Sequence, residues 1–476
     1  MLKNYFKLAW RSLFKNKLYS VIILSGLALA YTACILIYLH VSDELSYDRY
    51  HENGDRIYRV VKDFVNDDGT FLPDATTPPA LAPAILKEIP EVEEAVRLMP
   101  GWGNKYLVRR GDKTFFEELR YRGDSAVLKV FTFTFLEGNP DKALSKPENV
   151  IISKKMADKY FGHESPIGKN IEIGEGDSKL KVVTAVISDI PDNSHFHFDF
   201  LMAMPSQSVE WSSDWGWYNW YTYIKLKSGA NIKDVETKIV TLFKKNNPES
   251  KTRYYTQALS DIHLNSKLKW ELEPNGDATF VKIFIIVGIF IILIAAVNYI
   301  NLSIAQGLSR SKEVGIRKVS GAFGVRLITQ FLAESVLISM LAAIVAIALV
   351  ELVLPSLNDQ FQKNILPVSR QPFEILAGIM ALAFLLGTIS GFYPSLYLSA
   401  FKPVQVLKGA FQTGNRSLWL RKGLVIVQFT ISIALITGTI LVVRQVNYLR
   451  SKDLGFDKDH VVVVQNAQYV QQKVAM

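Results

Sequence analysis

Cysteine is nearly absent from this sequence, because Cys34 is the only one among 476 residues. A single cysteine excludes an internal disulfide framework and a cysteine-based metal site, so neither a disulfide-stabilised secreted domain nor a zinc-finger protein is expected. Cys34 also lies inside a long apolar run, residues 18–39. A run of that length argues against a purely soluble enzyme.

Charged residues make up 21% of the chain but are scarce in five long stretches. Each stretch reaches the length of about 20 residues that is needed to cross the hydrocarbon core of a bilayer. In lipid each must form a helix, because every backbone polar group has to find its partner within the segment. The predicted transmembrane helices are residues 18–39, 283–305, 327–354, 373–397 and 423–443.

The first apolar run has the basic lead of a signal peptide. It is longer than a signal core, however, and it ends in LHVSDE without a small-residue cleavage site. We therefore interpret it as a retained membrane anchor.

Positive charge is concentrated beside these runs. The net charge is +9, and residues 1–17, 306–330 and 398–422 carry five Lys or Arg residues each but only one acid between them. Short loops rich in Lys and Arg stay in the cytoplasm. Five alternating helices place all three segments on one side, which predicts a cytoplasmic N-terminus and an extracytoplasmic segment of residues 40–280.

The predicted fold is an α-helical membrane protein with about five transmembrane helices and a large α+β extracytoplasmic domain. Alternating apolar residues predict strands at 56–65 and 195–204, and a helix is expected over 78–99. The chain is predicted to begin with an amphipathic cytoplasmic helix (1–17), the first transmembrane helix (18–39) and the extracytoplasmic domain (40–280). A membrane domain with three helices follows (281–400), and its cytoplasmic loop covers 306–326. The chain then continues with a basic linker (401–422), the fifth transmembrane helix (423–443) and the start of a second extracytoplasmic domain (444–476).

Two parts of the chain repeat one pattern. The letters RSLF at 11–14 precede the first span, and RSLW at 416–419 precede the fifth. The acidic segment 46–57 after the first span is matched by 451–461 after the fifth. We interpret the chain as a duplication whose second copy is truncated; the alternative is that its final 30 residues have a different role.

The cytoplasmic loop contains the sequence SRSKEVGIRKVSGAFGVRL, residues 309–327. Its charged and apolar residues fit a short amphipathic helix that ends near Gly321 and docks into a groove on a partner protein. A basic loop that binds lipid headgroups is the alternative.

This loop resembles the signature of the FtsX/MacB-type permeases of ABC transporters. Three other stretches resemble the same family: VIISKKMADKYFGHESPIGKNIEI, DIPDNSHFHFDFL and ISGFYPSLYLSAFKPVQVLKG. The resemblance covers essentially the whole chain. Duplicated members of the family continue through a second exterior domain and three more spans, which this sequence does not contain.

The resemblance implies a non-catalytic membrane subunit that is driven by a cytoplasmic ABC ATPase on another chain. It implies a location in the bacterial inner membrane, a homo- or heterodimer of permeases, contact with membrane lipid and a periplasmic or outer-envelope partner, without nucleic acid. The loop would act as the coupling helix, and the residues carried over from the family are Glu313, Gly315, Ile316, Arg317, Lys318 and Gly321.

No phosphate-binding loop for ATP is expected in the chain itself. The nearest match, from Gly162 to Asn170, has five intervening residues instead of four and Asn in place of Ser or Thr. ATP is therefore expected to act through the partner, and no cofactor, metal or catalytic residue is predicted here. His195, His197 and Asp199 could form a metal site on one face of a strand, but we interpret them as the outward face of a half-buried strand.

Inside the predicted spans, Gly387 and Gly391 form a G-x-x-x-G pattern that lets two helix backbones approach closely. The polar residues Asn298, Asn301 and Glu334 are interpreted as groups that pack or pair with the basic loop, rather than as an ion pathway. The tryptophan-rich stretch 211–220 is interpreted as packing between lobes of the exterior domain, with a lipid or peptide site as the alternative.

Two other function classes remain open from the residues. The chain could be a membrane-anchored sensor or scaffold for an extracytoplasmic partner, without an ATPase. A membrane-bound enzyme is the third possibility, although no group of residues has the spacing of a reactive site.

Overall fold

The computed structural model describes residues 11, 17–66, 68–101, 105–174, 180–205, 212–309, 316, 319, 324–399, 415–453 and 455. These residues fall into two compact units. The helical unit comprises the described residues within 1–43 and 279–460, and the exterior unit those within 44–278. Residues 44–278 of the exterior unit thus lie between two described parts of the helical unit.

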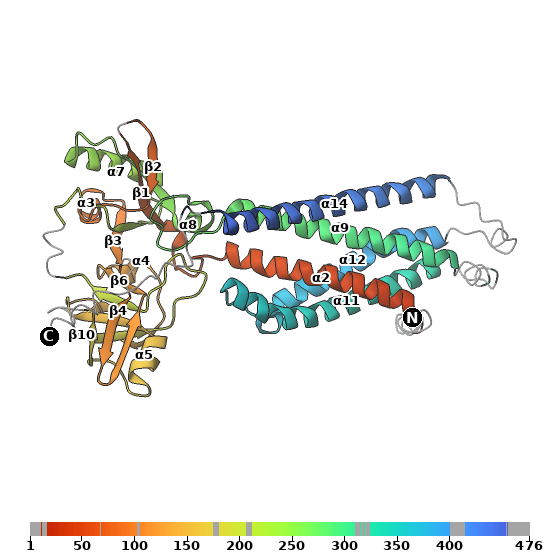
Figure 1. Ribbon diagram of the computed structural model, residues 1–476, viewed down its shortest axis with the longest axis horizontal. Coiled ribbons are helices and arrows are strands. Elements are labelled where there is room, and N and C mark those ends of the chain that lie inside the picture. Colours follow the sequence, from red (N-terminus) through yellow and green to blue (C-terminus); the bar gives the residue numbers. More distant parts are fainter. Residues whose placement is uncertain are drawn as a thin grey trace. The chain divides into compact units, whose positions relative to one another are not determined.

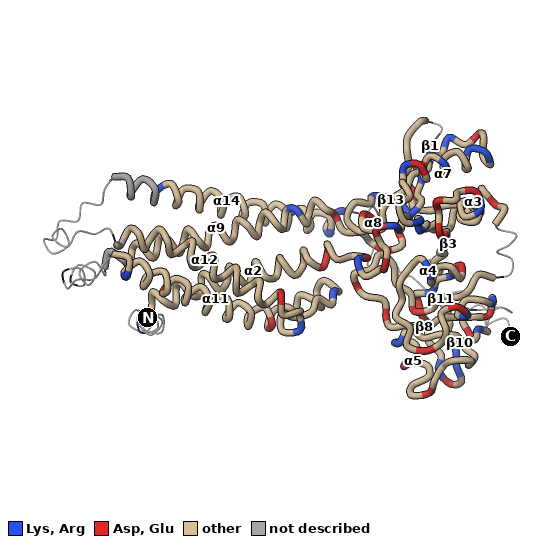
Figure 2. Tube along the Cα trace, turned by 180° about the vertical axis from the view of Figure 1, so that it is seen from behind, with Lys and Arg blue, Asp and Glu red and all other residues tan. Residues whose placement is uncertain are grey.

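Among the described residues, five helices are long and apolar enough to cross a membrane (Figure 1), which confirms the predicted fold class. They are α2 (Lys17–Leu45), α9 (Ala278–Ser309), α11 (Gly324–Phe361), α12 (Phe373–Ser399) and α14 (Asn415–Ser451). Lys, Arg, Asp and Glu are sparse along these helices and dense in the exterior unit (Figure 2). A short 3₁₀ turn, η3 (Val368–Arg370), lies between α11 and α12.

Four of the helices share one apolar core. Residues of α2, α9, α11 and α12 form a single buried cluster, in which Ala342, Ala343 and Ala346 of α11 are completely buried. Small side chains at these positions allow close packing of helices where lipid supplies no hydrophobic driving force. None of the described side chains of α14 is buried.

The exterior unit is built on one mixed sheet. The strands run in the order β13-β1-β12-β3-β6-β11-β8-β10-β9-β4-β5, with β2 paired to β1 and β7 paired to β10. Most neighbours are antiparallel, while β8 with β10 and β6 with β11 are parallel. The strands are β1 (Ile57–Val65), β2 (Phe71–Asp74), β3 (Val92–Pro100), β4 (Tyr106–Arg110), β5 (Lys113–Glu117), β6 (Arg120–Gly123), β7 (Phe135–Gly138), β8 (Asn149–Ser153), β9 (Asn170–Ile173), β10 (Leu180–Ile187), β11 (Phe200–Ala203), β12 (Tyr221–Leu226) and β13 (Arg253–Ala258).

Helices cover the two ends of this sheet and divide the exterior unit into two lobes (Figure 1). One lobe packs α3 (Leu81–Glu88) and α7 (Ile232–Asn246) on the β13 end, and the other packs α5 (Lys154–Phe161) on β8 and β10. A third cluster at the centre contains residues of α4 (Val127–Val130) and α8 (Leu259–Asn265). The unit also has the 3₁₀ turns η1 (Gly54–Arg56) and η2 (Pro140–Lys142).

Local signals account for α5. The Ser153 side chain accepts a hydrogen bond from the backbone N–H of Met156 at 3.3 Å, as an N-cap does. The helix stops at Gly162, whose φ of 63° is a left-handed value that glycine adopts without steric cost.

Two expected elements differ from the structure. The helix predicted over 78–99 ends at Glu88, and Val92–Pro100 form strand β3 between β12 and β6. Pairing on both sides makes the strand more favourable than continuation of a helix with Pro90 in it. The strand predicted at 195–204 is limited to Phe200–Ala203, and the residues before it form turns and loop.

Candidate functional site: the transmembrane helices and their polar joints

Most of the predicted coupling loop lies outside the described residues, including Glu313, Gly315, Arg317, Lys318 and Gly321. Ile316 is described, together with Val319, and both are helical. These two apolar side chains are 59% and 67% exposed. Two exposed apolar side chains are thus described in the segment that joins α9 to α11.

The backbones of α11 and α12 approach each other closely at Gly387 and Gly391. A Cβ atom built at Gly387 would lie 2.9 Å from the Cα of Val336, and one at Gly391 would lie 2.5 Å from the Cβ of Ser335. Real Cβ atoms cannot occupy such positions without a shift of the neighbouring helix. The two glycines therefore set the spacing of this helix pair.

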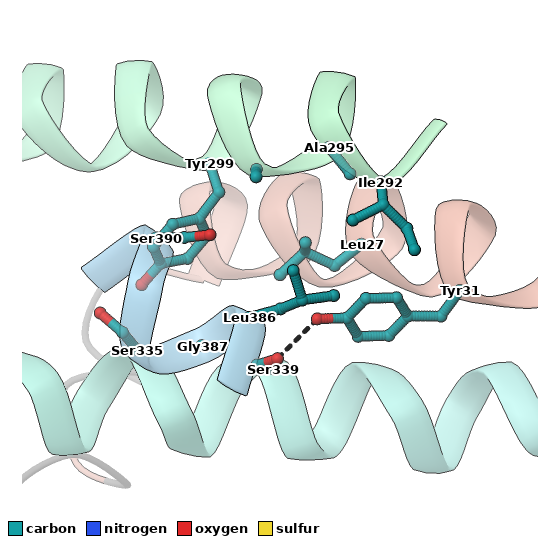
Figure 3. Close-up of a pocket in the computed structure, with 11 residues that line it drawn as sticks. Leu27, Tyr31, Ile292, Ala295, Tyr299, Ser335, Ser339, Leu386, Gly387 and Ser390 are labelled. Atoms are coloured by element: carbon teal, nitrogen blue, oxygen red, sulfur yellow. Dashed lines mark hydrogen bonds between the residues drawn. The ribbon is translucent and has the colours of Figure 1, made fainter. Parts of the chain in front are cut away.

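A chain of hydrogen bonds through two hydroxyl groups joins α2 to the α11–α12 pair, and Figure 3 shows the bond between Tyr31 and Ser339. The Ser339 hydroxyl donates to the carbonyl oxygen of Ala383 at 2.6 Å, and the Tyr31 hydroxyl lies 2.6 Å from the same Ser339 oxygen. Because the single Ser339 proton is used on Ala383, Tyr31 must be the donor. Three helices are thereby held together by polar contacts inside an apolar core.

The other polar residues of the spans lie nearer the cytoplasmic ends. Glu334 is buried at 8% exposure, and it lines a small cavity of about 30 Å³ together with Tyr299 and Ser303. That space is large enough for an ordered water, which needs about 10–15 Å³ and polar partners. Asn298 faces α2, since its side-chain nitrogen lies 3.9 Å from the Cβ position of Gly26. The described geometry thus places these groups inside the helix bundle.

A buried polar contact, called a joint below, lies at the C-terminal end of α2, where the exterior unit begins. The ring of His263 in α8 lies 2.9 Å from the Glu44 carboxylate and stacks on Tyr47 with ring centroids 3.3 Å apart. Gly276 closes this joint, because a Cβ there would lie 2.6 Å from Glu44 Oε2 and 2.8 Å from His263 Nε2. The residues that enter the exterior unit and those that leave it therefore meet at one buried contact.

A second buried joint is centred on Asp48, whose φ is 59°. Its carboxylate oxygen Oδ1 lies 2.8 Å from His195 Nδ1, and His195 Nε2 lies 2.7 Å from the Tyr223 hydroxyl of β12. Burial raises the pKa of Asp48, but the attraction of His195 and its hydrogen bonds outweigh burial, so the net shift is downward. The carboxylate is thus ionised and accepts from Nδ1–H.

His51 borders the same joint. Its Nδ1 accepts a hydrogen bond from the backbone N–H of Thr132 at 3.1 Å, and its Nε2 lies 3.8 Å from Asp48 Oδ1. Burial lowers the pKa of His51 to about 4 although Asp48 acts in the opposite direction. His51 is therefore neutral near pH 7.

The interpretation of the HFHFDF segment is partly wrong. His195 and Asp199 are buried at 3% and 9% exposure and are not an outward face. Asp199 accepts from the Ser153 hydroxyl at 2.9 Å, and His197 lies 2.9 Å from a Glu273 oxygen. Burial lowers the pKa of His197, but Glu273 reverses this, so the net shift is upward. Among the described residues no three His, Cys, Asp or Glu side chains are grouped to hold a metal ion.

The described tryptophans of the 211–220 stretch contact the exterior unit itself. The rings of Trp215 and Phe243 of α7 pack with centroids 6.0 Å apart. Trp220 is fully buried, and the Trp217 ring meets it edge-on with centroids 6.3 Å apart. The backbone carbonyl of Trp220 accepts from the N–H of Thr77 at 2.7 Å. The contact of Trp215 lies in the lobe that packs α3 and α7.

Sequence reasoning missed both joints. Glu44 and Asp48, just beyond the end of the first predicted span, were the available signal. Neither Glu44 with His263 nor Asp48 with His195 is close in sequence, so only the fold pairs them.

Comparison with known proteins gives two family matches. Residues 20–242 match the MacB-like periplasmic core domain, and residues 285–403 match the FtsX-like permease C-terminal domain. The chain belongs to the FtsX/MacB-type family of ABC transporter permeases. With its five apolar helices, it is a multi-pass inner-membrane protein whose large exterior unit is periplasmic.

Relatives with curated names include the pyoverdine export ATP-binding/permease protein PvdT of Pseudomonas putida, 23% identical over 68% of this chain and 47% of its own length. The macrolide export ATP-binding/permease protein MacB of Neisseria gonorrhoeae is 24% identical over 54% of this chain and 38% of its own length. The uncharacterised ABC transporter permease YknZ of Bacillus subtilis is 25% identical over 54% and 61%. The chain thus spans less than two thirds of the length of each of these three relatives.

Among solved structures, a domain of a permease protein from Porphyromonas gingivalis aligns with 24% identity and a TM-score of 0.38. The alignment covers 44% of this chain and 92% of that domain.

Proposed function

We propose that this permease couples ATP hydrolysis by a separate cytoplasmic ATPase to movement of its periplasmic unit, in export or another envelope process. The chain itself would be non-catalytic. The ATPase would bind the loop between α9 and α11, and the helices would transmit force rather than form a hydrophilic channel. A dimer of permeases is the proposed assembly, with the N-terminus in the cytoplasm.

The exposed apolar side chains of Ile316 and Val319 carry this proposal. A short amphipathic helix with such side chains fits a groove on a partner protein, and its basic neighbours suit a loop on the cytoplasmic side. This segment directly precedes α11, which packs along α12 and contacts α2 through Ser339 and Tyr31. A push on the loop would therefore act on packed helices, and α2 and α9 are the described helices that lead into residues 44–278 of the periplasmic unit.

Charge reversal of the loop tests the coupling. Arg317→Glu combined with Lys318→Glu should abolish stimulation of the ATPase by the permease in reconstituted vesicles, because like charges would replace complementary ones and oppose docking. ATP hydrolysis with and without the permease is the measurement. The single variant Ile316→Asp should give the same loss by exposing a charge to an apolar groove.

A matched control reverses Lys402 and Lys408, two basic residues of the predicted linker between α12 and α14. That variant keeps the same net charge as the loop variant and should retain stimulation. Stimulation that survived the loop reversal, or that was lost equally in the linker reversal, would contradict the proposed coupling role.

A further inference from the structure

The helical unit contains an apolar cavity of about 530 Å³ between α2, α9 and α12. It follows α2 from Tyr31 to Val41, with Ile285 and Ile292 of α9 on one side and Gly378 of α12 on the other. The volume lies within the range of about 300–1,000 Å³ that is typical of ligand sites. The hydrogen bond of Tyr31 with Ser339 lies at one end of this cavity, and no described residue of the coupling loop lines it, so the rest of the cavity requires a separate explanation.

The cavity extends through one leaflet of the bilayer. Val41 lies ten positions after Tyr31 in α2, which corresponds to about 15 Å at a helical rise of ~1.5 Å per residue. The hydrocarbon core is about 30 Å thick. The deep end is closed by Ala343 and Ala383, both buried, and Val41 lies just before the periplasmic unit. A spanning helix would need the full thickness, whereas one acyl chain of the periplasmic leaflet needs half of it.

Its periplasmic rim carries one carboxylate. Glu374 lines the cavity from the first turn of α12. Its side chain is exposed and makes no hydrogen bond or ion pair with any residue that the structure describes. A negative charge in this position is stabilised by the N-terminus of α12, and it remains available for a cation at the depth of lipid headgroups.

Open space in the cavity is also visible at Gly378. A Cβ built there would have no atom within 4 Å, in contrast to Gly387 and Gly391 on the same helix. A larger side chain at 378 would therefore fill the cavity without displacing a helix. This position provides a direct means of blocking the site.

We propose that the cavity binds one acyl chain of an amphiphile from the periplasmic leaflet, and that Glu374 contacts its ammonium-bearing headgroup. The one-leaflet depth selects a chain over a helix, and the unpaired carboxylate selects a cationic group over an anionic one. The site is independent of the ATPase loop, so it can be tested without relying on the proposed coupling.

The test uses the full chain in vesicles that contain phosphatidylethanolamine with a diazirine on one acyl chain. After illumination, cross-linked peptides are mapped by mass spectrometry. Labelling should concentrate on residues 31–41, 285–292 and 374–383, and it should exceed labelling of α14, which has no buried described side chain and is exposed to bulk lipid. Gly378→Phe should remove the labelling of these three segments.

Gly438→Phe is the matched control, because Gly438 of α14 also has no atom within 4 Å of its Cβ position. It should leave cavity labelling unchanged. Glu374→Gln should remove any preference for phosphatidylethanolamine over phosphatidylglycerol carrying the same probe, and it keeps the proposal testable if Gly378→Phe does not fold. Equal labelling of the cavity and α14, unchanged labelling in Gly378→Phe, or cross-links to a helix of a second copy in place of lipid would each overturn the proposal.

Discussion

At the scale of single residues, His51 is a buried neutral histidine whose protonation would destabilise the folded periplasmic unit. His51 lies at 4% exposure beside Phe131, with ring centroids 5.2 Å apart, and its Nε2 has no hydrogen-bond partner among the described residues. Burial and the neighbouring His195 both oppose a positive charge on His51 and lower its pKa. Folding therefore favours the neutral ring.

This preference predicts a pH dependence of the stability of the periplasmic unit. The pKa of His51 is about 4 in the folded chain and about 6.5 when unfolded. Between these values the unfolded state binds a proton that the folded state does not, so stability falls as the pH drops from about 6.5 to about 4, by up to ~3 kcal/mol. Thermal unfolding followed by tryptophan fluorescence measures it, since most tryptophans lie in this unit.

His51→Asn keeps an acceptor for the Thr132 N–H but cannot titrate, so it should flatten the dependence in that window. His163→Asn changes an exposed histidine and should leave the slope as it is. The pKa of His197 is raised, so the stability that it contributes is lost only as the pH rises above the usual pKa of histidine. The pKa of Asp48 is lowered, so the stability that it contributes is lost only as the pH falls below the usual pKa of aspartate. A wild-type slope retained in His51→Asn would assign the effect to another group.

At the scale of elements, the contact between α11 and α12 depends on two missing methyl groups. Gly391→Ala would place a Cβ 2.5 Å from that of Ser335, and Gly387→Ala would place one 2.9 Å from the backbone of Val336. Overpacking of this kind costs about 1–3 kcal/mol. Each variant should therefore lower the apparent melting temperature of the detergent-solubilised chain.

The same helix offers its own control. Gly378→Ala adds the same methyl group where no atom lies within 4 Å, so its melting temperature should match that of the wild type. Ser335→Gly removes the obstructing Cβ and should restore part of the stability of Gly391→Ala. If Gly378→Ala and Gly391→Ala lowered the melting temperature equally, Gly387 and Gly391 would not be what sets the spacing of α11 and α12.

The elements differ in how far the sequence determines them. The five apolar helices, β1, and the β8–α5 unit with its Ser153 cap follow from composition, alternation and capping, which are local signals. Val92–Pro100 cannot be assigned locally, because its strand is favoured by pairing with β12 and β6. The joints at Glu44 and Asp48 escape prediction for the same reason, since their partners lie 219 and 147 residues away.

At the scale of the whole molecule, the periplasmic unit is an insertion between α2 and α9. In the proposed coupling, α2 and α9 carry movement from the cytoplasmic loop to this unit, and Glu44, which contacts His263, is its first residue. Allosteric coupling needs a contact whose state both sites influence. The contact is tightly packed, because a Cβ at Gly276 would lie 2.6 Å from Glu44 Oε2, so an added methyl group there should disturb it.

Gly276→Ala should separate Glu44 from His263 while leaving the cytoplasmic loop unaltered. We expect the variant to stimulate its ATPase normally but to lose any nucleotide-dependent change in protease sensitivity of the periplasmic unit. Limited proteolysis of the reconstituted complex with ATP and vanadate, compared with no nucleotide, measures that change. The Arg317→Glu and Lys318→Glu variant should lose both readouts. If Gly276→Ala kept the nucleotide-dependent pattern, force would reach the periplasmic unit without this joint, and α2 and α9 would each have to carry it independently.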